Sequence, residues 1–229
     1  MKNKVHLIDC MEFMKTIPDK HYDLAIVDPP YGIGLSFSNE KEKKWNDKCP
    51  GDDYFNEIVR ISEEQIIWGV SYFPKIPGDN GGRIVWNKKI GFNNKMQISA
   101  CDIAFYSKHK RIAYFEYQFY GNVQQGFINL KNEDGPNGRE RRIHPTQKPV
   151  ALYKWLLQNY AKPGQTIFDS HVGSGLIRIA CHDMGFDFEG CELDPDYYEA
   201  QEKRFVNYIK QDELFEKKQL QTLMFNDSI

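Results

Sequence analysis

The sequence lacks the features that mark secreted, membrane-spanning or zinc-binding proteins. Its five cysteines are scattered, with no CxxC pair and no Cys/His cluster, so neither a disulfide framework nor a structural zinc site is predicted. No stretch is long and apolar enough to cross a bilayer, and Asp9 and Glu12 interrupt any signal-like run near the N-terminus. We therefore expect a cytoplasmic protein, in a reducing compartment.

An excess of charge of either sign is also missing. The chain carries 30 basic and 32 acidic residues among 229, for a net charge of -2. Overall charge therefore favours no particular partner, and any surface for nucleic acid must be local. The length suffices for one α/β domain with a small insertion. No internal repeat or low-complexity tract is present.

Short apolar runs do occur, and they alternate with amphipathic stretches. The runs typical of strands lie at 5–8, 24–27, 65–70, 83–86, 102–106, 166–169 and 186–191. The stretches typical of helices lie at 11–16, 54–62, 176–184, from 196 to about 210, and after Pro149, and Asp9 is a candidate N-cap for the first of them. This alternation predicts βαβ units and a mostly parallel sheet.

The segment Asp28-Pro29-Pro30-Tyr31 directly follows the buried run 24–27. Two consecutive prolines end strand pairing and provide no N–H donors. The Asp28 carboxylate and the Pro29 carbonyl are left as acceptors, which suits a ligand that donates two hydrogens from one atom, such as an exocyclic amino group. Tyr31 offers a ring face to a planar base. By itself, the segment is equally typical of a strand-ending turn with an incidental aspartate.

A glycine-rich turn, Gly173-Ser174-Gly175, lies between the predicted strand 166–169 and the predicted helix 176–184. Glycines let the backbone of such a turn approach a ligand closely. The next predicted strand ends in Glu192, where an acidic side chain can accept hydrogen bonds from ribose hydroxyls. The pair predicts an adenosine-containing cofactor without specifying which one.

Residues 107–142 interleave basic and aromatic side chains, unlike the acidic C-terminal part of the chain. Such a local surface is typical of phosphate contacts, although an ordinary hairpin with solvated lysines fits as well. The candidate nucleic-acid-binding residues are Lys108, Lys110, Arg111, Arg139, Arg141 and Arg142. The polar segment 34–53 is either a solvated loop or a flap that closes on substrate.

The segment His144-Pro145-Thr146-Gln147-Lys148-Pro149 precedes a predicted helix. An anionic ligand group there would meet both the Lys148 ammonium and the backbone N–H groups of the helix N-terminus. A plain capping segment is the alternative.

Taken in order, these motifs resemble those of the amino-methyltransferases that act on DNA. They are most similar to the β class, in which the DPPY motif comes first and the cofactor glycine turn comes late, as in bacterial and phage adenine N6 methyltransferases. The resemblance covers nearly the whole chain. It implies a Rossmann-like α/β fold with a mostly parallel seven-stranded sheet, one antiparallel strand and helices on both faces. It also implies S-adenosylmethionine as methyl donor and double-stranded DNA as partner.

The resemblance also implies roles for individual residues. The catalytic residues would be Asp28, Pro29, Pro30 and Tyr31. The residues on the cofactor side would be Asp9, Cys10, Asp28, Lys148, Asp169, Ser170, His171, Gly173, Ser174, Gly175, Glu192 and Leu193. Of these, Asp9 and Cys10 would flank the adenine and Glu192 would hold the ribose. The chain departs from the family pattern at Ser170-His171, commonly Pro-Phe, and at Leu176, commonly Thr.

The implied organisation has three parts. Residues 1–106 would form the catalytic half, 107–143 a small basic target-recognition insertion, and 144–229 the cofactor-binding half with a C-terminal tail. A base inside a duplex cannot reach such a site, so we expect base flipping onto Tyr31. The chemistry needs no metal. The tail 221–225 loosely resembles peptides that dock on replication sliding clamps, and a homodimer is compatible with the sequence.

Several alternatives stay open. Asp rather than Ser before the prolines favours adenine N6, but a cytosine-N4 enzyme and an RNA amino-methyltransferase share the same logic. A nucleic-acid-binding module without turnover would leave the DPPY motif unexplained. A nicotinamide-dependent oxidoreductase would explain the glycine turn and Glu192 but not the basic insertion. The recognition sequence and any partner endonuclease are not set by the sequence.

Overall fold

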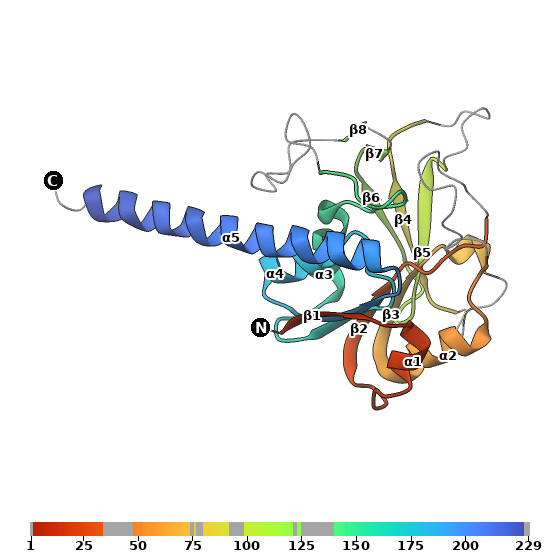
Figure 1. Cartoon of the computed structure of the whole chain (residues 1–229). Coiled ribbons are helices and arrows are strands. Elements are labelled where there is room, and N and C mark those ends of the chain that lie inside the picture. Colours follow the sequence, from red (N-terminus) through yellow and green to blue (C-terminus); the bar gives the residue numbers. More distant parts are fainter. Residues whose placement is uncertain are drawn as a thin grey trace.

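An eight-stranded sheet with helices on both faces forms the core of the protein (Figure 1). The computed structural model describes residues 2–33, 48–73, 76, 80–91, 99–120, 123–124 and 140–226. The strands are β1 (Asn3–Leu7), β2 (Tyr22–Val27), β3 (Ser62–Trp68), β4 (Gly82–Asn87), β5 (Cys101–Tyr106), β6 (Ile112–Glu116), β7 (Phe119–Tyr120), β8 (Val123–Gln124), β9 (Thr166–Asp169) and β10 (Asp187–Glu192). The helices are α1 (Cys10–Met14), α2 (Asp52–Ile61), the 3₁₀ turn η1 (Val70–Tyr72), α3 (Val150–Tyr160), α4 (Leu176–Met184) and α5 (Pro195–Asn226).

The order of the strands in the sheet is β1-β10-β9-β2-β3-β5-β4-β6. β5 runs antiparallel to both of its neighbours, and the other neighbouring strands are parallel. The mostly parallel α/β sheet with an antiparallel strand is thus confirmed, but the expected number of seven strands is wrong. The eighth strand is β6, at the start of the expected insertion, which pairs with β4 at the sheet edge. A separate hairpin, β7–β8, follows it.

The central strands bury both of their faces. Leu24 and Ile26 of β2 pack with residues of α3, α4 and α5, whereas Ala25 and Val27 pack with residues of α1 and α2. Successive side chains of a strand point to opposite faces, so a continuous apolar run such as 24–27 fits a strand covered on both sides. The result is a three-layer arrangement, with α1 and α2 on one face and the later helices on the other (Figure 1).

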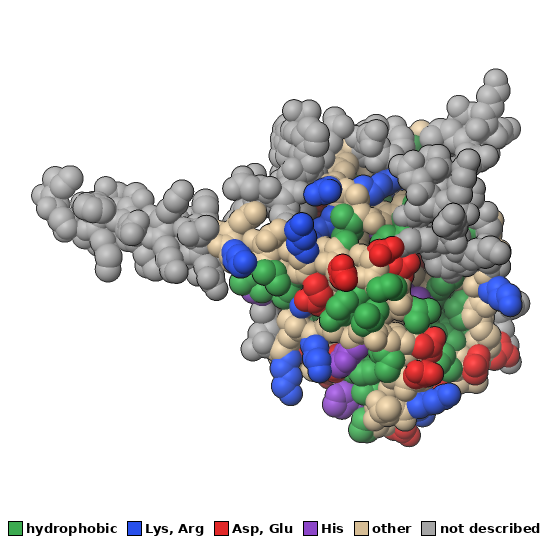
Figure 2. Space-filling view, in the orientation of Figure 1, with side chains coloured by type: hydrophobic (Ala, Val, Ile, Leu, Met, Phe, Trp, Pro, Cys, Tyr) green, Lys and Arg blue, Asp and Glu red, His purple; other side chains and the backbone are tan. Residues whose placement is uncertain are grey.

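The last helix is longer than the sequence predicted. α5 continues to Asn226 and not to about residue 210, so the segment 221–225 is helical. Beyond its first turns, α5 extends away from the body of the molecule (Figure 1). Among the described residues, no helix combines the length and apolar character that crossing a membrane requires. Acidic and basic side chains both occur on the surface seen in Figure 2.

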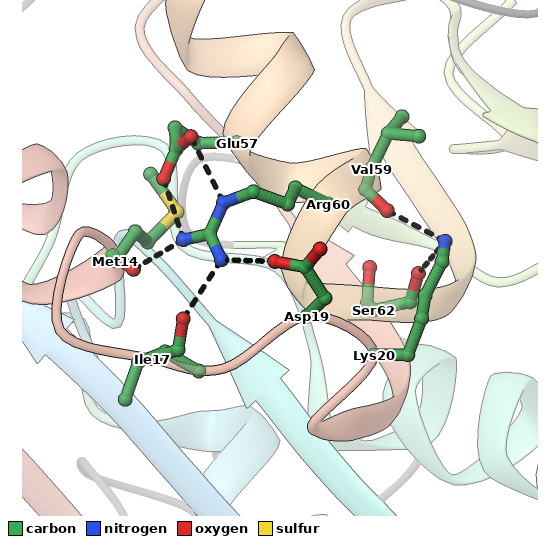
Figure 3. A network of polar contacts seen from close by, with 8 residues as sticks. All are labelled: Met14, Ile17, Asp19, Lys20, Glu57, Val59, Arg60 and Ser62. Carbon is green, nitrogen blue, oxygen red and sulfur yellow. Dashed lines mark hydrogen bonds and ion pairs between the residues drawn. The ribbon is translucent and has the colours of Figure 1, made fainter.

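Arg60, in the last turn of α2, fastens the α1–β2 connection to that helix (Figure 3). Its guanidinium donates to the backbone carbonyls of Met14 and Ile17 at 2.7 and 2.8 Å, and it pairs with Asp19 at 2.7 Å and Glu57 at 2.8 Å. The planar fork of five N–H donors makes these contacts simultaneous. The network therefore ties the α1–β2 connection to α2.

We predict that Arg60→Ala lowers the free energy of unfolding by about 1–3 kcal/mol, because two carbonyls and two carboxylates lose a charged donor. Urea unfolding followed by circular dichroism measures the change. Arg60→Lys keeps the charge without the fork, and we expect it to recover only part of the loss. An Arg60→Ala protein as stable as the wild type would contradict this account.

Candidate active site

The candidate site lies between β2 and β9, where the order in which successive strands join the sheet reverses. β2 and β9 are parallel neighbours, paired at Leu24↔Ile167 and Ala25↔Phe168. From β2 the chain passes through α2 to β3 on one side, and from β9 it passes through α4 to β10 on the other. The two helices cover opposite faces, so β2 and β9 flank a topological switch point. Open α/β sheets bind ligands beyond the carboxyl ends of strands at such a point.

Asp28, just beyond β2, is held by two neighbours. The buried Lys148 ammonium forms an ion pair with Asp28 Oδ2. The Tyr31 hydroxyl donates to Asp28 Oδ1 at 2.5 Å and lies 3.3 Å from Lys148 Nζ. Lys148 Nζ also lies 5.3 Å from the centre of the Trp68 ring, within cation–π range. The first and last of the expected catalytic residues and one expected cofactor residue therefore form a single polar group.

The Tyr31 ring packs against a segment that sequence reasoning overlooked. Tyr31 stacks on Tyr72, with ring centroids 4.9 Å apart and an interplanar angle of 13°. A Cβ on Gly69 would lie 2.2 Å from a Tyr31 ring carbon, so the ring sits directly on a bare backbone. Gly69 also has φ +81, a conformation that glycine adopts readily. Pro29 is buried and Pro30 half-buried between Asp28 and this ring.

Glu192, at the end of β10, connects two expected cofactor segments. Its carboxylate accepts from Gly173 N at 2.8 Å and from Asp194 N at 2.9 Å, and burial raises its pKa. Its carbonyl accepts from Ile8 N at 3.1 Å, which connects the end of β1. Each carboxylate oxygen has a second lone pair, so Glu192 can accept further hydrogen bonds. Leu193 beside it is 66% exposed.

Ser170-His171, the departure from the family pattern, forms a chain of polar contacts. Tyr54 Oη lies 2.6 Å from Ser170 Oγ, which lies 2.8 Å from His171 Nδ1. His171 Nε2 lies 4.0 Å from Cys10 Sγ, so the β1–α1 turn and the turn after β9 are adjacent. Burial lowers the pKa of His171 to about 4, so its ring is neutral at pH 7. Tyr54 was missed because α2 reads as an ordinary amphipathic helix.

Asp9 caps the helix that starts at the same turn. Its carboxylate accepts from Met11 N at 2.8 Å and from Glu12 N at 3.2 Å, as the sequence predicted.

Asp169, at the end of β9, adds a third carboxyl group to this edge of the sheet. Burial, above all, raises its pKa to about 8; the nearby Asp28 and Glu192 carboxylates act in the same direction, and the His171 N–H bond and Lys148 oppose them. The His171 backbone N–H donates to Asp169 Oδ1 at 3.0 Å. With a pKa of about 8, Asp169 is mostly protonated at pH 7, so it adds a neutral carboxyl group near the Asp28–Lys148 ion pair.

Arg204 of α5 connects the glycine turn to the region before α3. Its guanidinium donates to the Ser174 carbonyl at 2.7 Å and to the Arg141 carbonyl, and it lies 3.5 Å from Gln147 Oε1. Sequence reasoning missed it because an arginine inside an amphipathic helix gives no local signal of a buried contact.

The basic residues predicted to form one surface lie in different parts of the structure. Lys108, Lys110 and Arg111 lie between β5 and β6, at the amino-terminal edge of the parallel strands, where Arg83 N at the start of β4 bonds to Arg111 O. They therefore lie at the edge opposite Asp28. Arg141 and Arg142 are exposed; Arg204 joins the Arg141 carbonyl to the glycine turn, and the Arg142 guanidinium lies over the Phe119 ring. Arg139 and most of the 34–53 segment, residues 34–47, fall outside the described residues.

Comparison with known sequences matches residues 80–203, more than half of the chain, to a family model described as DNA methylase and named for N6 and N4 methyltransferases. The chain is 23% identical over 233 residues to the Type II methyltransferase M.HpaI of Haemophilus parainfluenzae, covering 89% of this chain and 74% of that protein. It spans 66% of the length of two other Type II methyltransferases.

Solved structures share the fold at low sequence identity. The M1.HpyAVI–SAM complex superposes with a TM-score of 0.55 at 21% identity, covering 88% of this chain and 98% of that one. The PvuII DNA methyltransferase, named as cytosine-N4-specific, gives a TM-score of 0.57 at 13% identity, covering 95% and 92% of the two chains. These similarities confirm the Rossmann-like methyltransferase fold.

The glycine turn provides a test of how tightly the site is packed. Gly175 and Gly185, at the two ends of α4, have φ of +73 and +76. A Cβ on Gly175 would lie 2.9 Å from Gln201 Cβ, whereas one on Gly185 meets nothing within 4 Å. We predict that Gly185→Ala costs about 1–2 kcal/mol of stability from backbone strain, and Gly175→Ala about 1–3 kcal/mol more. Urea unfolding of both variants checks this; equal losses would contradict the close packing.

Proposed function

This chain belongs to the DNA methylase family, and we propose that it transfers a methyl group from S-adenosylmethionine to the exocyclic N6 of adenine in double-stranded DNA. The observation that carries the proposal is the Asp28 carboxylate beyond β2, held beside Tyr31 and next to the turn that follows β9. An acceptor for an amino group and a nucleotide-type turn then share one switch point. The motif order, with DPPY before the glycine turn, supports the β class.

The residues at this edge fit the proposed cofactor. When bound, S-adenosylmethionine supplies an electrophilic methyl group on a positively charged sulfonium. Glu192 retains acceptor capacity for ribose hydroxyls, and the glycine turn lies directly beside it. Cys10 and His171 lie together where the adenine would be flanked.

The protein's own residues serve to activate the amino nitrogen. That nitrogen is a poor nucleophile because its lone pair is delocalised into the ring. Hydrogen bonds from its two hydrogens to the Asp28 carboxylate and the Pro29 carbonyl would localise the lone pair as the nitrogen becomes tetrahedral. The nitrogen gains positive charge in the transition state, and Asp28 stabilises that charge and is positioned to accept the released proton at Oδ1.

Cytosine N4 is the runner-up target. Aspartate before the two prolines supports adenine, but the fold is shared with the PvuII enzyme, which is named as cytosine-N4-specific. Both targets present an exocyclic amino group on a flipped base, and the Asp28 carboxylate and Pro29 carbonyl can accept from either. Arg141, which is exposed and whose backbone Arg204 joins to the glycine turn, is our candidate for phosphate contacts. An RNA substrate is a further alternative that the assay below includes.

We predict that Asp28→Ala lowers methyl transfer by on the order of 10²–10³-fold, because the transition state loses its charged acceptor. Binding of S-adenosylhomocysteine, followed by calorimetry, should change little, since the turn after β9 is intact. Transfer of labelled methyl groups is measured on unmethylated plasmid DNA and on an RNA transcript, with chromatography of the product nucleosides.

The matched control is Asp19→Ala, which removes a carboxylate that is 75% exposed and belongs to the Arg60 network instead. We expect it to keep the wild-type transfer rate. Methylation by Asp28→Ala at the wild-type rate would contradict the proposed mechanism. Label that appears only in RNA would show that RNA, and not DNA, is the substrate.

A further inference from the structure

We propose that Lys148 is a positioning residue for Asp28, whose ammonium holds carboxylate oxygen Oδ2 so that Oδ1 is the atom that accepts from the target amino group. The proposal rests on the proposed function and goes beyond it, because it assigns the two oxygens of Asp28 different tasks. It also gives Lys148 a role other than the cofactor contact that the motif resemblance implies.

The ion pair is sheltered from solvent. The Lys148 side chain is 3% exposed and that of Asp28 is 19% exposed. A surface ion pair is screened and contributes little, whereas a pair removed from water interacts strongly and fixes geometry. Breaking such a pair by removing one partner leaves an uncompensated charge. Asp28 is therefore held through Lys148 at Oδ2 and not by solvent.

The other oxygen of Asp28 has an exchangeable partner. Tyr31 Oη donates to Oδ1 at 2.5 Å, and the hydroxyl also lies 3.3 Å from Lys148 Nζ. A hydroxyl donor can be replaced by an amino N–H donor without loss of a charge, whereas replacing the ammonium would strand the carboxylate. Oδ1 is thus the oxygen that a target amino group can take over, with Tyr31 as its partner in the absence of a base.

Lys148 is itself held by rigid surroundings. It directly precedes Pro149, the residue that caps α3, and the first amide of that helix, Val150 N, donates to the buried Glu140 Oε1 at 3.1 Å. Its ammonium lies over the Trp68 ring on β3. Backbone and side chain are therefore restrained from two elements, which is what a residue that positions another must offer.

A role of Lys148 in binding the cofactor makes the opposite prediction. An ammonium has three N–H donors, and here two of its neighbours are Asp28 and Tyr31. If Lys148 served chiefly to bind a carboxylate of the cofactor, its loss would weaken cofactor binding. If it positions Asp28, its loss would slow transfer while leaving cofactor binding nearly unchanged.

The test uses the full chain with Lys148→Met, which keeps the unbranched stem of the side chain and removes the ammonium. Single-turnover transfer to unmethylated plasmid DNA at saturating S-adenosylmethionine should fall by on the order of 100-fold. The dissociation constant for S-adenosylhomocysteine, measured by calorimetry, should change by less than about threefold. Lys148→Arg should recover part of the rate, because it keeps the charge but not the single-point geometry.

Lys154→Met is the matched control, since Lys154 lies on the following helix and pairs with Asp183 away from the site. It should transfer at the wild-type rate. A Lys148→Met enzyme that transfers at the wild-type rate would overturn the proposal. So would a dissociation constant raised tenfold or more with the saturated rate preserved. Wild-type protein that methylates no amino group would instead refute the proposed function, so the two failures are distinct.

Stability supplies a second readout that does not depend on activity. Lys148→Met should lower the urea midpoint, and Asp28→Asn should restore part of it in the double variant, because the uncompensated carboxylate is gone. If Lys148→Met does not fold, recovery of folding in Asp28→Asn/Lys148→Met supports the pair. Additive losses, or a double variant that remains unfolded, would contradict it.

Discussion

The Asp28 carboxylate must be kept largely out of water and yet remain an acceptor, and the rest of the site depends on how this is achieved. Lys148, which lies 120 residues later in the sequence, supplies the opposite charge. Tyr31, which lies three residues later, supplies a hydrogen bond from its hydroxyl. A paired and hydrogen-bonded carboxylate tolerates burial that an isolated one does not. The same burial strengthens its effect on charge developing at a nearby nitrogen.

The sheet topology brings these distant residues together. Because β2 and β9 are parallel neighbours whose following helices cover opposite faces, Asp28 and the glycine turn leave the sheet at one point. Glu192 then ties the turn to the ends of β10 and β1, and Arg204 ties it to the segment before α3. Each contact joins two segments far apart in sequence. The geometry of the site therefore depends on the packing of the whole domain.

Much of this arrangement was predictable from local chemistry. The apolar run at 24–27, the paired prolines and Asp9 as a helix cap have signals within a few residues, and the structure agrees with each. The edge strand β6 was not predicted, because its alternating exposed and half-buried residues follow a cluster of lysines and arginines that dominates the composition. The grouping of Lys108, Lys110 and Arg111 with Arg141 and Arg142 also failed, since sequence proximity says nothing about the edge of a sheet at which a turn lies. Lys148 was expected on the cofactor side, but its ion pair with Asp28 is a tertiary contact that no local pattern reports.

The most direct test of the account is the identity of the modified nucleoside. DNA from a host that lacks its own amino-methyltransferases, but expresses this chain, would be digested and its nucleosides measured by mass spectrometry against a host expressing the Asp28→Ala variant. The account predicts N6-methyladenine in the first sample and its loss in the second. N4-methylcytosine alone would contradict the proposed target, and an unmodified genome beside a folded, cofactor-binding protein would contradict the proposed reaction.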